Sequence, residues 1–333
     1  MQIFHYFNKI IGICKFSAAI NPKSWTFLWV WIFFAFLRPV YIFSEDTELD
    51  LGKLFFSVSP RILENGTITD IGFGYRYNEK YSQRLNFSFS NESKNEEFKS
   101  EGVEDSLNAR TEKNYELFLF PVELTFLRSS VTELKASAGI YYNYNILTEK
   151  GFFNMPSLEV LGKERVNSFT NDFSMHTLGP CIEIAYSNRA EYFELSSRAG
   201  IVPVFYFWSK QKMGMVPLLD PLYAEYTQDN FGSPYVYADI NIIILKYFSF
   251  SFLYDFSRLQ YQVIDFDDDL KWYNPSRKVL SNSFKLEGSL LIPMMNSVYT
   301  KIGLGYSWVS IQQDTAAPIW NKQFYLVFNT SIR

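Results

Sequence analysis

Two kinds of side chain alternate along the stretch from Thr132 to Ile146. Every second position from Leu134 onward is apolar or aromatic, whereas the positions between, from Glu133 to Asn145, are mostly charged, polar or small. Successive side chains of a β-strand point to opposite faces. The stretch therefore predicts a strand with one apolar surface, which carries Ile140, and one polar surface, which carries Ser137.

The same alternation recurs from residue 54 to the C-terminus and predicts twelve strands. Proline is poorly tolerated in a central strand, so Pro203 predicts a bulge in the seventh. The strands are expected near residues 54–62, 70–77, 84–90, 115–127, 132–146, 178–186, 193–207, 236–244, 249–257, 283–292, 298–308 and 324–333.

The connections between these strands are alternately short and long. Short turns are expected near 78–80, 128–131, 188–191, 246–247 and 294–297; longer loops near 91–112, 149–171, 209–233, 265–280 and 312–321. Only the short link at 64–66 departs from this order. Such alternation with an even strand number is typical of transmembrane barrels. The pattern predicts an all-β protein with one closed antiparallel transmembrane β-barrel of about twelve strands, or ten if the first hairpin is irregular.

The N-terminus has the features of an export signal. Basic residues precede a thirteen-residue, largely apolar run, Trp25–Leu37, which is followed by Arg38 and Pro39. This order predicts a signal peptide over residues 1–44, cleaved after Ser44, with the barrel over residues 45–333. An uncleaved membrane anchor is the alternative, although the run is short for a spanning helix.

Composition narrows the functional classes. Aromatic residues make up 19% of the chain, which suits the aromatic girdles of a membrane barrel. A net charge of −4 gives no basic footprint for nucleic acid. Cys181 is the only cysteine after the leader, so no internal disulfide is expected. No cofactor or metal site is predicted, because the acidic run at 267–269 lacks the glycine and terminal glutamate of a calcium loop.

The polar parity of the strands is expected to face the bore. A bore of about twelve strands is wider than a filled eight-stranded core and narrower than a general porin. Its charges either line a solute channel or pair across the bore and fill it, and loops folding inward are a further way to constrict it. Arg61, Asp70 and Glu123 share this face. The predicted pore-lining residues are Arg76, Arg84, Glu133, Lys135, Glu183, Glu194, Arg198, Asp239, Asp255, Lys285, Glu287 and Lys301.

His176 is the only histidine after the leader, and Asp172 stands four residues before it. A histidine near an acid could serve as the base of an outer-membrane hydrolase. A lone histidine near a loop–strand junction is more often an interface residue. The sequence carries no phosphate-binding loop, paired-cysteine metal site or nucleophile elbow, so we expect the protein not to be an enzyme.

In its leader, alternating strands and C-terminal strand, the chain from about 45 to 333 resembles bacterial outer-membrane β-barrel proteins. Its many phenylalanines and tyrosines and its leader look like spirochaete examples. The resemblance implies the cell outer membrane, contact with its lipids, and docking on the barrel-assembly machinery. Such barrels usually end in an aromatic residue, whereas Phe328 is followed here by five more residues, which weakens that docking.

These features predict a narrow porin-like channel for small solutes. The alternative is a non-conducting surface barrel whose loops bind host or matrix molecules, and an outer-membrane hydrolase is the third hypothesis. No nucleic-acid partner is expected, and the sequence sets no oligomeric state.

Overall fold

The computed structural model describes residues 53–97, 106–154, 166–216, 222–232, 234–263, 265–266, 272–295, 298–314 and 317–332. All of them belong to one compact unit, residues 52–333. No helix in this part of the chain is long and apolar enough to cross a membrane. The predicted leader, residues 1–44, lies outside the described residues.

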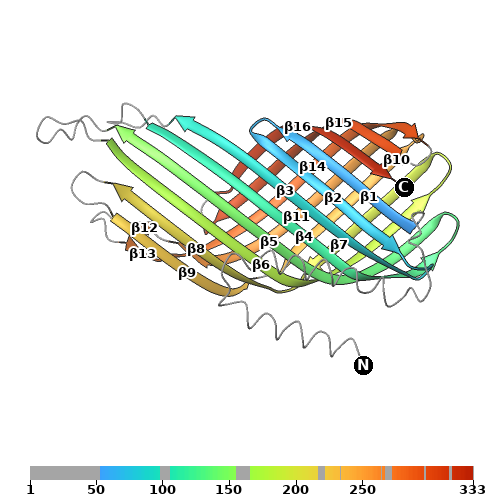
Figure 1. The fold of residues 1–333 in the computed structure, drawn as a ribbon, viewed down its shortest axis with the longest axis horizontal. Coiled ribbons are helices and arrows are strands. Elements are labelled where there is room, and N and C mark those ends of the chain that lie inside the picture. Colours follow the sequence, from blue (N-terminus) through green and yellow to red (C-terminus); the bar gives the residue numbers. More distant parts are fainter. Residues whose placement is uncertain are drawn as a thin grey trace, which may run out of the picture. The chain divides into compact units, whose positions relative to one another are not determined.

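The described elements are strands (Figure 1). They are β1 (Leu54–Leu63), β2 (Gly66–Arg76), β3 (Tyr81–Glu97), β4 (Ser106–Arg128), β5 (Thr132–Asn154), β6 (Val166–Arg189), β7 (Phe193–Val202), β8 (Phe205–Val216), β9 (Leu222–Gly232), β10 (Tyr235–Ile244), β11 (Phe248–Gln262), β12 (Asp265–Phe266), β13 (Trp272–Tyr273), β14 (Ser276–Met295), β15 (Val298–Gln313) and β16 (Ile319–Ile332).

The sheet closes on itself. Strands β1 to β6 are neighbours in chain order, and β1 also pairs with β16. From β16 the ring continues through β15, β14, β11, β10 and β7 back to β6, with every pairing antiparallel. Both β7 and β8 pair with β6, one after the other, so together they occupy one position in the ring. In the next position β10 pairs with β7 and β9 pairs with β8. The ring therefore has twelve strands. The predicted closed antiparallel barrel is confirmed, and its first hairpin is regular.

The break between β7 and β8 lies at Pro203 and Val204, where the sequence predicts a bulge. On the β7 side Ile201 pairs with Ile182, and on the β8 side Tyr206 pairs with Leu178. Proline has no backbone N–H to give to the ladder, so the pairing stops there and resumes one residue out of step.

Three predicted loops are largely strand, and these predictions were wrong. The pairing of β3 with β4 continues to Glu97, that of β5 with β6 to Asn154, and β8 and β9 fill most of 209–233. The prediction failed because it required an apolar face. A strand that has left the lipid can be polar on both faces, and ion pairs such as Arg110–Glu149, at 3.7 Å, hold these extensions together.

The uninterrupted alternation predicted over residues 115–127, the fourth strand, is also wrong. In the register of β4 with β5, Leu119 pairs with Ile140 and Val122 with Ala138, so a bulge separates the two positions. Upstream of the bulge, Phe118 therefore shares the bore face with Glu123. A bulge adds one residue to one strand and reverses its parity.

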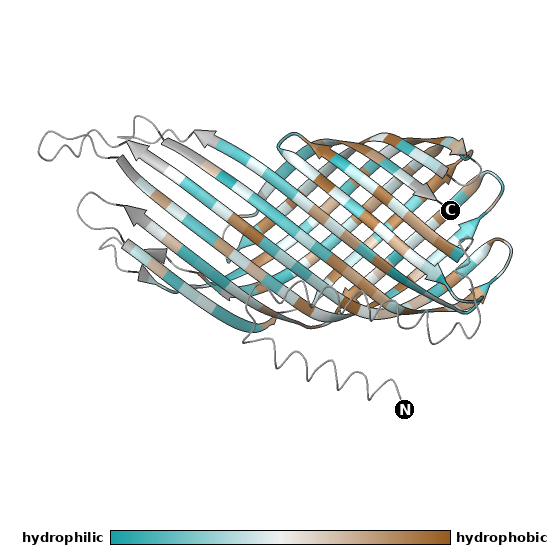
Figure 2. Cartoon of the chain, viewed as in Figure 1, coloured by the Kyte–Doolittle hydropathy of each residue, from teal (hydrophilic) through white to brown (hydrophobic). Residues whose placement is uncertain are grey.

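The outward face of the barrel carries an apolar belt (Figure 2). Large apolar side chains there are exposed although they lie in a continuous sheet. A closed barrel with such a surface suits lipid, because no backbone group is left unpaired at an edge. The architecture is that of an outer-membrane barrel. Members of the belt include Ile62, Ile184, Ile240, Phe250, Leu286, Leu304 and Leu326.

Candidate functional site: the bore and its outer rim

Arg84, on β3, lies at the centre of one group of charges in the bore. Its Nε is 3.1 Å from Glu123 Oε1 on β4, and its Nη2 pairs with Glu183 on β6. The guanidinium lies 4.5 Å from the centre of the Phe120 ring. The two carboxylate side chains are 4% and 1% exposed. Charges this well buried require partners of opposite charge, and Arg84 is that partner for both carboxylates.

A second group surrounds Arg61 on β1. Its guanidinium pairs with Asp70 on β2, and its Nε is 2.7 Å from Glu287 on β14. Tyr325 on β16 donates a hydrogen bond to the same Glu287 carboxylate at 3.1 Å. Since β15 and β16 separate β14 from β1 in the ring, the Arg61–Glu287 pair reaches across the inner surface.

The other predicted pore-lining residues have the same orientation. Arg198 pairs with Asp239, and Glu133 lies 3.5 Å from Arg76 and 3.4 Å from Lys135. Register and these contacts place all twelve predicted residues on the inner surface; that they line a path for solute stays a prediction. The remaining members are Asp255, which accepts a hydrogen bond from Tyr235, Lys301, which donates to Asn241, and Glu194 and Lys285, placed by their register.

Aromatic side chains from strands that are not neighbours meet inside the bore. Phe118 and Tyr141, from β4 and β5, have ring centres 4.9 Å apart. Tyr141 lies 5.2 Å from Tyr235, and Phe118 lies 5.0 Å from Tyr237, both on β10. In the ring, β5, β6 and β7 separate β4 from β10, so these contacts join strands three and four places apart on the inner surface. We call Phe118, Tyr141, Tyr235 and Tyr237 the aromatic layer.

The aromatic layer rests on a buried apolar cluster formed by Phe120, Cys181, Val202, Phe205 and Phe207. Cys181 lies on the bore face of β6, and its side chain is 1% exposed in this cluster. Sequence reasoning missed the layer as a unit. The available signal was tyrosine on the polar parity of the strands, where a bore would otherwise carry small or charged residues.

Gly200, on β7, leaves the space that Tyr237 occupies. A Cβ at Gly200 would lie 2.2 Å from Tyr237 Cζ, far inside van der Waals contact. With that space free, the Tyr237 hydroxyl donates a hydrogen bond to Glu183 at 2.7 Å. The glycine thus couples the aromatic layer to the Arg84 group.

His176 faces outward and stacks between two aromatic rings. Its ring centre is 4.0 Å from Tyr144 and 4.5 Å from Trp208, and Tyr142 Oη is 2.9 Å from its Nδ1. Asp172 lies four residues away on the same strand, which is about 13 Å at the usual rise per residue. This geometry is that of an aromatic girdle residue, and it places Asp172 too far from His176 to act as its acid partner.

The described part of the chain contains no group of three or more histidine, cysteine, aspartate or glutamate side chains arranged to hold a metal ion. The 267–269 acidic run lies outside the described residues.

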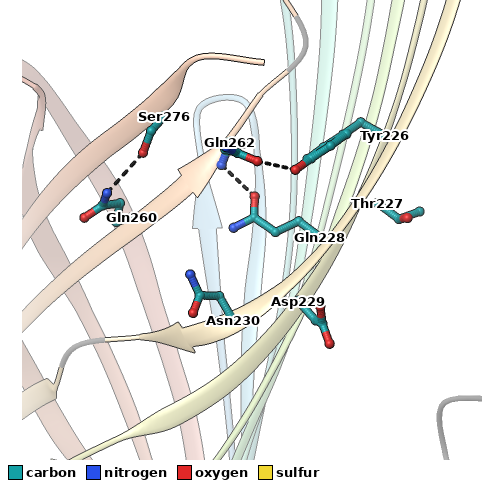
Figure 3. A pocket seen from close by; sticks show the side chains of 8 residues that line it. All are labelled: Tyr226, Thr227, Gln228, Asp229, Asn230, Gln260, Gln262 and Ser276. Carbon is teal, nitrogen blue, oxygen red and sulfur yellow. Dashed lines mark hydrogen bonds between the residues drawn. The ribbon is translucent and has the colours of Figure 1, made fainter. Parts of the chain in front are cut away.

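The described residues leave a gap in the barrel wall at its outer rim, the end where the long connections lie. There β9 pairs with β8, and β11 pairs with β14, but β9 and β11 share no backbone ladder in the described residues. Side chains bridge the gap instead: Tyr226 donates to Gln262 Oε1, and the Gln262 N–H donates to Gln228 Oε1 at 2.6 Å (Figure 3). We call this gap the seam. A cavity of about 370 Å³ opens along it.

Comparisons with known proteins give architecture only. No protein-family model matches the chain, and no curated protein does. Among solved structures, the translocator domain of autotransporter NalP from Neisseria meningitidis is 9% identical with a TM-score of 0.40, over 89% of this chain and 93% of that one. The P. putida toluene transporter TodX is 8% identical with a TM-score of 0.45, over 86% and 91%. The outer membrane protease OmpT from Escherichia coli is 12% identical with a TM-score of 0.29, over 84% and 93%.

Proposed function

We propose that the protein is a narrow porin-like channel for small solutes in the outer membrane, held closed by the aromatic layer. The observation that carries this proposal is a local apolar cluster in an otherwise polar bore, formed by the aromatic layer and the buried cluster on which it rests. Four side chains from three strands make the contacts of the layer, and polar or charged residues line the bore on both sides of them. A bore filled only to support the wall needs no such polar entrances.

The layer also accounts for selectivity by size. Ring centres about 5 Å apart leave no room for a solute between these rings, so a solute that crosses the layer there requires the rings to rotate apart. Mixed charges in the bore, mutually paired as in the Arg84 group, provide neither a purely cationic nor a purely anionic lining. This arrangement favours weak charge selectivity, because pore-lining charges set which ions enter.

Recording from planar bilayers tests the proposal. The wild-type barrel is expected to show small, infrequent conductance steps, and the double variant Phe118→Ala, Tyr235→Ala larger and longer ones. The matched control is Phe250→Ala, which removes an aromatic ring from the outward belt. Correctly folded wild-type and double-variant proteins that both fail to conduct would count against a channel.

One observation favours the second candidate, a non-conducting surface barrel that binds host or matrix molecules. The strands β4, β5 and β6 have 23 or 24 residues, whereas β1 and β2 have 10 and 11. At about 2.5 Å of height per tilted residue, β5 exceeds the ~25 Å belt by roughly 30 Å. Figure 1 shows these long strands running past the ends of the short ones. Removing the 155–165 segment and finding ligand binding unchanged would weaken this candidate.

We propose no enzymatic role. The stacked position of His176 explains that residue without a hydrolase, and an unchanged hydrolytic rate in His176→Ala protein would support this view. The spirochaete likeness and docking on the barrel-assembly machinery stay predictions from the sequence.

A further inference from the structure

The seam brings together faces of two strands that would normally lie on opposite sides of the wall. On β9, Tyr226 and Gln228 pair in register with Gln211 and Ser209 of β8, which face the bore. On β11, Gln262 shares its parity with the outward-facing phenylalanines, since the pairing with β14 contains no register shift. Bore-facing side chains of β9 therefore meet outward-facing side chains of β11, and the cavity lies between them.

The lining of this cavity is polar and almost uncharged. It consists of Tyr226, Thr227, Gln228, Asp229, Asn230, Gln260, Gln262 and Ser276. Asp229 is the single ionisable carboxylate, and Figure 3 shows it directed away from Gln228 and Gln262. Its carboxylate accepts a hydrogen bond from Tyr206 on the neighbouring strand at 2.9 Å. Figure 3 shows Thr227 directed away as well, so the remaining groups are four carboxamides, a phenol and a hydroxyl.

We propose that the seam binds a neutral polyhydroxylated molecule, that is, a sugar or polyol. A carboxamide offers two donors and an acceptor, and a sugar hydroxyl is both donor and acceptor, so several such groups complement one another. A charged ligand would find no opposite charge among the facing groups. The cavity volume of about 370 Å³ falls within the usual range for small-molecule sites.

Carboxamides continue from the seam along the inner surface of the rim. Gln211, the register partner of Tyr226, donates to Asn171 at 2.9 Å, and Asn171 donates to Glu149. One strand further, Asn145 donates to Asn143 at 2.5 Å. A hydroxylated molecule that leaves the seam toward the bore would therefore meet further carboxamide donors and acceptors. The site itself requires no conduction, so it stands or falls separately from the channel.

The test measures binding of maltose to the full-length barrel by saturation-transfer NMR, in a detergent without a sugar headgroup. Maltose is expected to bind, and glucosamine and glucuronate to bind at least several-fold more weakly. A neutral hydrogen bond contributes about 1 kcal/mol, so Gln228→Leu should weaken maltose binding by roughly threefold to tenfold. The double variant Gln228→Leu, Asn230→Leu should show no measurable binding.

Gln313→Leu is the matched control, because it makes the same change at the same rim on β15, outside the cavity. Its maltose affinity should equal that of the wild type. Asn230→Leu alone is the variant least expected to disturb folding. Among the hydrogen bonds described at the seam, the Asn230 side chain accepts only one, from the adjacent Phe231 N–H. The variant should still weaken binding.

Binding of dextran, a polysaccharide, distinguishes two possible sources of the ligand. Binding of maltose alone identifies a free solute, whereas binding of dextran as well identifies a surface glycan. Absence of maltose binding by folded protein would overturn the proposal. So would charged sugars binding as well as maltose, or seam variants that bind like the control.

Discussion

Replacing Ile240 with arginine tests whether the outward belt lies in lipid. Ile240 is the sixth of ten residues in β10, five from Tyr235 and four from Ile244. With a rise of about 3.3 Å and a tilt of about 40°, each residue adds roughly 2.5 Å of height. Ile240 then lies about 13 Å below one end of the strand and about 10 Å above the other, near the centre of a ~25 Å belt.

At that depth an arginine on the lipid face costs about 2–4 kcal/mol, falling to about 0–1 kcal/mol near the interface. Ile244→Arg is therefore the matched control. The two isoleucines belong to the same strand and outward face, and each is 39% exposed, so depth is the main difference between them. The deeper substitution should lower the folding equilibrium constant by roughly 30-fold to 1,000-fold, since 1.4 kcal/mol is a factor of ten.

The assay is reversible folding into phosphatidylcholine vesicles, with guanidinium titration followed by tryptophan fluorescence and extrapolated to water. A bore-facing substitution, Ser196→Arg, provides the second comparison, and it should cost less than Ile240→Arg because its surroundings are polar. Equal costs at Ile240 and Ile244 would refute the placement of the belt in lipid. A larger cost at Ser196 than at Ile240 would refute the assignment of the faces.

Two further predictions concern the interior. Gly200→Ala should destabilise the barrel by about 1–3 kcal/mol, because its methyl group overlaps Tyr237, whereas Gly288→Ala should be nearly neutral, since its Cβ would meet only Phe250 atoms at 3.9–4.0 Å. Arg84→Met should cost about 3–5 kcal/mol by leaving two buried carboxylates without their cation, while Arg110→Met, in an exposed pair, should cost no more than about 1 kcal/mol. Guanidinium titration in vesicles measures all four, and equal losses within either pair would contradict the reasoning.

Local alternation determined much of this protein. Apolar and polar residues alternate with a period of two wherever a strand has lipid on one side and water on the other, because strand geometry imposes that period. This alternation predicts the strands within the belt, the short turns between them and the faces of residues such as Glu183 and Ile240. Above the belt the alternation carries less information. Both faces of β5 and β6 meet water there, and so their extensions to Asn154 and from Val166 resembled a loop.

What the sequence alone determined is the barrel: its class, a strand number of about twelve with ten left open, and the parity of most side chains, since these depend on neighbours along one strand. What only the tertiary structure decided depends on strands far apart in the chain. The bulge in β4 turns Phe118 inward, and closure of the ring brings it against Tyr237. In the described residues β9 and β11 share no ladder, and at that gap Gln228 lies beside Gln262. Contacts across a lumen have no period along the chain, because closure of the ring sets which residues face each other.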